Sequence, residues 1–369
     1  CKTGFRFTLL TTIACICLGF ASFAQKEKDY ESISIAEGLS QGMVFDMLQD
    51  ADDFIWVATK NGLNRYDGYS FKVFTNDPYN IHSLSSNTIS KLFEDSKGRI
   101  WAGTENAGVN IYDKRTGIFY RVTHIPSNPS SLSGNGIKAI EEIPDGRILV
   151  ATDAAGLNIV TITPDLFDKD SAPPVTRLSL PNNKQVYGMG KDKNGNIWIG
   201  GMDGTIYQFD YKKNSFTPLP GGKLYNNGYL NKDGSVVINN NLFLDDGKDI
   251  IPLFDTGRWP EGNIIFKPNS ALWEFHHREL YFYDISRWKK GAKPNWNEKL
   301  PIDPVTRICY PFIIDRSGIL WSGSVGYGLR KYHKANTIFT TQAKGNSIRL
   351  IVPTAGNDLF LVDYAYKWM

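Results

Sequence analysis

Four aspartates stand at matching places in the chain: Asp50, Asp95, Asp192 and Asp315. Carboxylates at fixed spacing could serve as general acids and bases in a hydrolytic site. Each of these four, however, precedes a turn and a segment centred on tryptophan, and a catalytic carboxylate need not recur in every unit. An aspartate at the start of a turn accepts hydrogen bonds from nearby backbone amides. We therefore interpret all four as hairpin caps.

His276-His277 is the only histidine pair in the sequence and a conceivable metal ligand set. Adjacent side chains on a strand point to opposite faces, which disfavours a shared metal ion. The motifs His-Glu-x-x-His and Gly-x-x-x-x-Gly-Lys-Ser/Thr do not occur in the sequence. We accordingly expect no catalytic residue, no metal and no cofactor in this chain.

The same aspartates open an internal repeat. Its clearest copy covers residues 95–112 and reads Asp-x-x-Gly-x-Ile-Trp-x-Gly-Thr, followed by Gly-Val-Asn-Ile-Tyr. Other strong copies begin at residues 50, 192 and 315, a further copy has Asp145-Gly146 and then Leu149 at the tryptophan position, and two weaker ones are centred on Val237 and Trp273. A period of roughly 40–50 residues with several short strands per unit is typical of propeller blades.

One unit, residues 88–123, illustrates the physical basis. Apolar alternation and Gly/Asn/Asp turns predict strands at 88–94, 100–104, 109–112 and 119–123. A lone four-stranded sheet cannot bury both faces, whereas radial stacking buries them and leaves only short edges. The repeated tryptophans, Trp56, Trp101, Trp198 and Trp321, are then expected to pack between neighbouring blades.

The sequence thus predicts an all-β fold, a seven-bladed β-propeller of four-stranded antiparallel blades. Residues 30–35 are expected to supply the outer strand of the last blade and so close the ring. Segments 347–353 and 358–363 resemble the first two strands of a further unit. These segments could complete an eight-bladed ring, but we favour the interpretation that residues 342–369 begin a second propeller.

Residues 1–24 have the pattern of a secretory signal peptide. Lys2 and Arg6 precede an apolar stretch from Phe7 to Phe20, and Ser22-Phe23-Ala24 fits a cleavage site. An uncleaved membrane anchor and a lipoprotein cysteine at Cys15 are the alternatives. After removal of this segment only Cys309 is left, so no intramolecular disulfide is expected.

We therefore divide the chain into a signal peptide (1–24), a propeller domain (25–341) and a truncated second propeller (342–369). We expect the sequence to be a fragment of a longer protein. The formal net charge is +3 without a long basic run, which argues against a nucleic-acid-binding region.

The repeat resembles that of the two-component regulator propeller family. The resemblance extends over residues 30–341 and includes Gly38-Leu39-Ser40 ahead of the first unit; the units around Val237 and Trp273 depart from it. It implies the periplasmic sensor region of a hybrid histidine kinase of glycan-degrading bacteria. In such proteins the kinase and the membrane helix lie further along the chain, and the parent protein is expected to be a homodimer.

In a propeller, the loops between second and third strands open on one face, together with the links between blades. In this chain those loops are polar, differ between repeats and include aromatic rings, which suits an oligosaccharide. The candidate ligand-binding residues are Lys60, Asn61, Glu105, Asn106, Asp153, Asp203, His276, His277 and Tyr327.

Our leading hypothesis is an oligosaccharide-binding sensor for polysaccharide utilisation. A secreted propeller lyase or hydrolase and a protein-interaction scaffold are the alternatives. The repeat Asp-x-x-Gly is one residue longer than the Asp box of sialidases, which counts against that class of hydrolase.

Overall fold

The computed structural model describes residues 30–153, 156–163, 173–181, 185–191, 195–201, 205–223, 311–332 and the strands between and beyond them. The chain divides into two compact units. One comprises Ser32–Lys331, and the other comprises Cys1–Glu31 with Tyr332–Met369.

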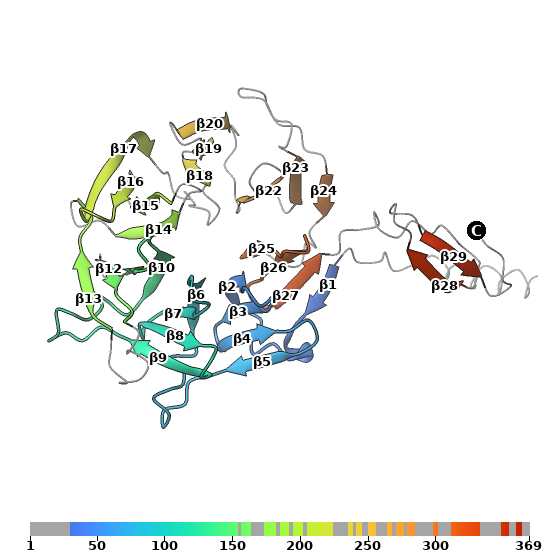
Figure 1. The fold of residues 1–369 in the computed structure, drawn as a ribbon, viewed down its shortest axis with the longest axis horizontal. Helices are drawn as coiled ribbons and strands as arrows, with labels where there is room; N and C mark the ends of the chain where they lie inside the picture. The colour runs from blue at the N-terminus through green and yellow to red at the C-terminus, as the bar shows by residue number, and fades with distance from the viewer. Residues whose placement is uncertain are drawn as a thin grey trace, which may run out of the picture. The chain divides into compact units, whose positions relative to one another are not determined.

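Seven antiparallel sheets follow one another along the first unit (Figure 1). Six have four strands and one, β18-β19-β20, has three in the part of the chain that is described. The first four consecutive sheets are β2 (Val44–Gln49), β3 (Ile55–Thr59), β4 (Gly62–Tyr66), β5 (Phe71–Phe74); β6 (Ile89–Glu94), β7 (Ile100–Thr104), β8 (Val109–Asp113), β9 (Ile118–Val122); β10 (Ile137–Glu142), β11 (Ile148–Thr152), β12 (Gly156–Val160), β13 (Val175–Leu178); and β14 (Val186–Lys191), β15 (Ile197–Gly201), β16 (Thr205–Asp210), β17 (Ser215–Lys223).

The next two sheets are β18 (Ser235–Ile238), β19 (Asn241–Asp245), β20 (Ile250–Asp255); and β21 (Ile264–Lys267), β22 (Ala271–His276), β23 (Glu279–Asp284), β24 (Glu298–Pro301). The seventh has the order β1-β27-β26-β25, with β25 (Phe312–Ile314), β26 (Leu320–Ser322), β27 (Leu329–Tyr332) and β1 (Tyr30–Ile33). The fold is therefore a β-propeller with these sheets as blades, as predicted.

The predicted closure of the seventh blade is confirmed, because β1 occupies its fourth position beside β27. The expected strand over residues 30–35 ends at Ile33, however, and the chain turns into a 3-10 helix, η1 (Ile35–Glu37). Ser34 and Glu37 form a capping box at its start, and Gly38 ends it at φ 101°. The signal S-x-x-E followed by glycine is present in the sequence and explains the difference.

In the other unit, β28 (Ile348–Pro353) and β29 (Leu359–Asp363) form an antiparallel pair. These are the two strands expected there. Their assignment to a second propeller stays a prediction.

Burial of the tryptophans between blades is confirmed where the structure describes them. Trp56 and Trp101 are fully buried. Trp56 packs with Leu92 and Tyr112 of the next blade, and its ring lies 5.5 Å from that of Tyr112. The innermost strands β25, β2, β6, β10 and β14 contact one another in succession. Apolar residues of both sheet faces are thereby removed from water, which is the main stabilising term of such a fold.

Each described cap does more than hold its turn. The buried carboxylate of Asp50 accepts hydrogen bonds from the Phe54 amide at 2.9 Å and from Trp56 Nε1 at 2.7 Å. Asp95 and Asp315 bond Trp101 Nε1 and Trp321 Nε1 at 2.8 Å in the same way. The aspartate thus satisfies the one polar atom of an otherwise apolar inter-blade wedge, which burial requires.

Among the blades whose first turn is described, the third lacks both the aspartate and the tryptophan. There Leu149 replaces the tryptophan, and Ile143 takes the place of the aspartate, with its backbone in the same turn bonded to Arg147 and Gly146. Both side chains are buried. Asp145, two residues further along the same turn, is exposed and bonds Arg147. Aspartate and tryptophan are therefore replaced together by an apolar pair.

A second repeated contact joins neighbouring blades. In the first three blades, the residue at the end of the first strand accepts a hydrogen bond from the hairpin of the preceding blade: Gln49 from the Arg316 amide at 2.7 Å, Glu94 from the Ala51 amide at 2.8 Å, and Glu142 from the Ser96 amide at 2.9 Å. We call these three contacts the inter-blade clasps. The Gln49 clasp links the first blade to the seventh.

The inter-blade clasp is absent between the third and fourth blades, where the backbone amide donor is missing. In the third blade the donor position holds Pro144, which has no amide hydrogen. The next blade correspondingly has Lys191 instead of an acceptor, and its Nζ donates to the Glu142 carbonyl at 3.1 Å.

Candidate functional site

Antiparallel order within a blade sends the ends of its strands to two opposite faces. The loops between second and third strands and the links between blades share one of them, which we call the loop face. The turns between first and second and between third and fourth strands share the other, the turn face. The candidate ligand-binding residues come from loops of the loop face.

These loops are held by hydroxyl groups at the ends of the second strands. Thr104 Oγ1 donates to the Gly108 carbonyl at 2.7 Å and accepts from the Ala107 amide at 2.8 Å. Ser324 Oγ repeats both contacts with Gly328 and Tyr327 at 2.9 Å. The side chains between the anchors are therefore presented from an ordered backbone.

The structure places six of the nine candidates on this face with described surroundings. Five polar ones, Lys60, Asn61, Glu105, Asn106 and Asp153, are exposed, and Tyr327 is 53% exposed. Backbone bonds tie these loops to neighbouring segments; the Glu105 amide, for example, donates to the Thr88 carbonyl at 3.2 Å. Of the other candidates, His276 ends β22, and Asp203 and His277 lie outside the described residues.

The loop face has an element that the sequence analysis missed. Two long links, residues 75–88 and 123–136, which we call the link loops, carry the same Pro-x-Asn-x-x-Ser-Leu-Ser pattern at 78–85 and 126–133. The link loops adjoin the candidate loops: the Gly62 amide donates to the Asn87 carbonyl at 2.6 Å and the Gly108 amide to the Asn135 carbonyl at 2.9 Å. Recurrence of this pattern at the blade period was the available signal.

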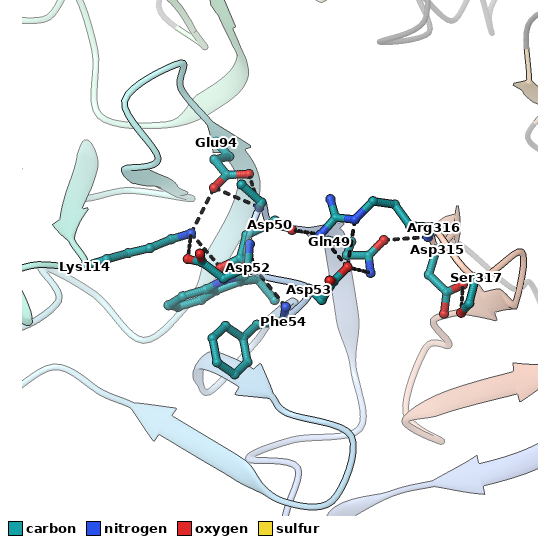
Figure 2. Close-up of polar contacts among 12 residues, drawn as sticks. Gln49, Asp50, Asp52, Asp53, Phe54, Glu94, Lys114, Asp315, Arg316 and Ser317 are labelled. Atoms are coloured by element: carbon teal, nitrogen blue, oxygen red, sulfur yellow. Dashed lines mark hydrogen bonds and ion pairs between the residues drawn. The ribbon is translucent and has the colours of Figure 1, made fainter.

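The turn face carries the largest described cluster of charges (Figure 2). Lys114 Nζ lies 2.8 Å from Asp50 Oδ2, 2.9 Å from Asp52 Oδ2 and 2.9 Å from Glu94 Oε1. Burial alone would lower the pKa of Lys114, but these hydrogen bonds outweigh it and raise the pKa. The hydrogen bond from Lys114 also lowers the pKa of Asp52. The ammonium group of Lys114 therefore lies among carboxylates of the first and second blades, and the cluster joins these two blades.

Arg316 extends the turn-face contacts to the seventh blade. Besides the clasp from its amide, its Nε donates to Asp53 Oδ1 at 2.7 Å (Figure 2). Asp53 occupies the left-handed turn position, φ 70°, that glycine holds in other units. Both side chains are largely exposed, so this ion pair contributes little to stability.

Neither a metal site nor a membrane span is found in the described part of the chain. No group of three or more His, Cys, Asp or Glu side chains there is arranged to hold a metal ion. No described helix is long and apolar enough to cross a membrane.

Comparison with known proteins confirms the resemblance noted in the sequence. The profile of the family described as two component regulator propeller matches residues 38–61, 83–106 and 179–203, which lie in the first, second and fourth units. A protein named histidine kinase P4 from Formosa agariphila is 41% identical over 56 residues, 15% of this chain and 4% of that protein. The chain therefore spans a small part of the length of that relative.

The fold is shared with solved propellers. The extracellular domain of a hybrid two component system from B. thetaiotaomicron superposes with a TM-score of 0.63 at 18% identity, covering 90% of this chain and 46% of that one. A catalytically inactive virginiamycin B lyase from Staphylococcus aureus superposes at 0.58 and 14% identity, covering 82% and 97%. At these identities both likenesses concern the fold alone.

Proposed function

We propose that this chain is the ligand-sensing region of a hybrid two-component histidine kinase and that it binds an oligosaccharide at its loop face. The observation that carries the proposal is the contrast between the ordered backbone of the candidate loops and the exposure of their side chains. Carboxylate, amide and tyrosine groups offered from a fixed frame suit the hydroxyl groups and apolar ring faces of a sugar.

The rest of the assignment follows from the repeat family. A sensor of this kind lies outside the inner membrane, in the periplasm, and takes part in signalling for polysaccharide utilisation. Its kinase domains and membrane helix belong to the longer parent protein, which we propose to be a homodimer. No step of catalysis is proposed for the residues of this chain.

Calorimetric titration of the chain with a panel of short defined oligosaccharides, neutral and uronic-acid-containing, tests the proposal. We expect at least one to bind with measurable heat and to be recovered unchanged. Shortening of the sugar during incubation would instead support the lyase or hydrolase alternative. Absence of binding across the panel would contradict the sensor proposal and favour the scaffold.

Substitution on the two faces tests the location. Tyr327→Ala removes an aromatic ring from the loop face. We expect it to lower the affinity for the tightest-binding oligosaccharide of the panel about tenfold, the usual effect of losing an aromatic contact. Tyr69→Ala is the matched control, because Tyr69 is 96% exposed in the turn between β4 and β5, on the turn face. Equal affinities for both variants and the unsubstituted chain would remove Tyr327 from the site.

A further inference from the structure

The two link loops are ordered by the same internal contacts. In the first, Ser83 Oγ accepts from the Asp77 amide at 2.9 Å, and Asn87 Oδ1 accepts from the Asn76 amide at 2.6 Å. In the second, Ser131 Oγ accepts from the Ile125 amide at 2.9 Å. Because the same contacts occur in both link loops, the shared sequence pattern specifies the loop conformation.

An arginine from the fourth strand of the following blade fastens each loop. Arg121 on β9 donates through Nε to the Ser83 carbonyl at 3.0 Å, and through Nη2 to the carbonyls of Asn80 at 3.0 Å and Leu84 at 2.9 Å. It also donates to Ser83 Oγ at 2.9 Å. Among the described residues no carboxylate is paired with Arg121, and its four hydrogen bonds, from Nε and Nη2, all go to the loop.

Arg177 on β13 makes the matching set of contacts. Its Nε donates to the Ser131 carbonyl at 2.8 Å, and its Nη2 donates to the carbonyls of Asn128 at 3.0 Å and Leu132 at 2.9 Å. A planar guanidinium has the geometry to reach several carbonyls at once, which a lysine lacks.

Comparison with the first blade indicates that this arginine is associated with a preceding link loop and is not a general feature of the fourth strand. Arg121 pairs across the sheet with Asn110, and Arg177 with Asn158. In the first blade the partner of the equivalent Asn64 is Val73. That blade is preceded by η1 rather than by a link loop, so there is nothing for an arginine to fasten.

The tips of the fastened loops contribute little to the core. Tyr79 is 99% exposed and Ile81 62% exposed, although Leu84 at the base of the same loop is fully buried. Ordering a segment costs conformational entropy, about 1–2 kcal/mol per residue for the backbone. The exposed side chains of Tyr79 and Ile81 bury too little apolar surface to offset this entropy cost, which suggests that the loop is ordered for recognition.

We propose that Arg121 and Arg177 are positioning residues that hold the link loops as a preformed part of the ligand-binding face, with Tyr79 as an aromatic platform for a sugar ring. The first link loop adjoins the candidate loop at Lys60, because Thr88 Oγ1 donates to the Lys60 carbonyl at 3.3 Å. A sugar bound over Lys60 and Asn61 thus has the link loop beside it. The ligand class rests on the proposed function, whereas the fastening role of the arginines does not.

Hydrogen–deuterium exchange without ligand tests the fastening role. Arg121→Met is expected to accelerate exchange of amides in residues 76–84 at least tenfold while leaving β6–β8 unchanged. Arg115→Met is the matched control, since Arg115 is largely exposed in the turn between β8 and β9, on the turn face. Unchanged exchange in residues 76–84 would overturn the positioning role.

Titration with the best oligosaccharide of the panel tests the platform. We expect Tyr79→Ala and Arg121→Met each to weaken binding about tenfold, with thermal midpoints close to that of the unsubstituted chain. If a sugar binds and neither substitution alters its affinity, this inference is wrong and the proposed function stands. If no sugar binds, the proposed function fails and the platform fails with it.

Discussion

Replacing Asp50 by alanine should cost about 3–5 kcal/mol of unfolding free energy, the range observed when one partner of a buried charged network is removed. The carboxylate is fully buried and bonds two backbone amides, Trp56 Nε1 and Lys114 Nζ. Alanine leaves the buried indole N–H without an acceptor in an apolar inter-blade layer. Urea unfolding followed by tryptophan fluorescence measures the loss.

Asp145→Ala is the control for this prediction. Asp145 also stands in a hairpin, but its side chain is exposed and its main partner is Arg147, so a loss below about 1 kcal/mol is expected. The third blade supplies a second control. Because Ile143 and Leu149 replace the pair there, Asp50→Ile should cost less in a Trp56→Leu background than alone, with a coupling of about 1–2 kcal/mol. Additive losses would contradict the pairing.

Replacing Gly328 by alanine should destabilise the closure of the seventh blade by about 3 kcal/mol or more. Gly328 has φ +81°, which costs a side-chain residue about 1–2 kcal/mol, and its added Cβ would overlap the Ile33 carbonyl of β1. Since backbone atoms cannot yield as a side-chain tip does, β1 must move away from β27. The thermal midpoint and protease sensitivity near residue 33 report that movement.

Gly318→Ala separates conformational strain from contact. Gly318 lies in the same blade at φ +84°, but nothing stands within 4 Å of its added Cβ. We expect it to lose only about 1–2 kcal/mol, the left-handed strain alone. If the two variants lose equal stability, β1 does not lie against Gly328 as the seventh sheet requires.

The strands and turns of the blades were predictable because each blade repeats the same short sequence pattern of alternating apolar residues and turn residues. The expected strand at 100–104 matches β7, and the expected strand at 88–94 differs from β6 by one residue. Alternation and turn residues act over a few positions, so a single sequence contains them. The predicted cap role is confirmed for Asp50, Asp95 and Asp315, each of which accepts from the backbone amide four residues on. Asp192 lies outside the described residues.

What could not be predicted depends on contacts between blades. The bond from Asp95 to Trp101 Nε1 requires knowledge of how the indole is turned, and the clasp from Ala51 to Glu94 joins residues 43 positions apart. The placement of Ile143 at the aspartate position was hidden by the nearby Asp145. For the loop face, the sequence located the loops but not the arginine fastening, because Arg121 reads as an ordinary strand residue.

The most direct test of the whole account is hydrogen–deuterium exchange of the chain with and without its best oligosaccharide. Protection on binding is expected to be concentrated on the loop face, at residues 60–62, 76–84, 105–108 and 325–328. Protection confined to the turn face, at residues 50–54, 95–99 and 113–117, would contradict it.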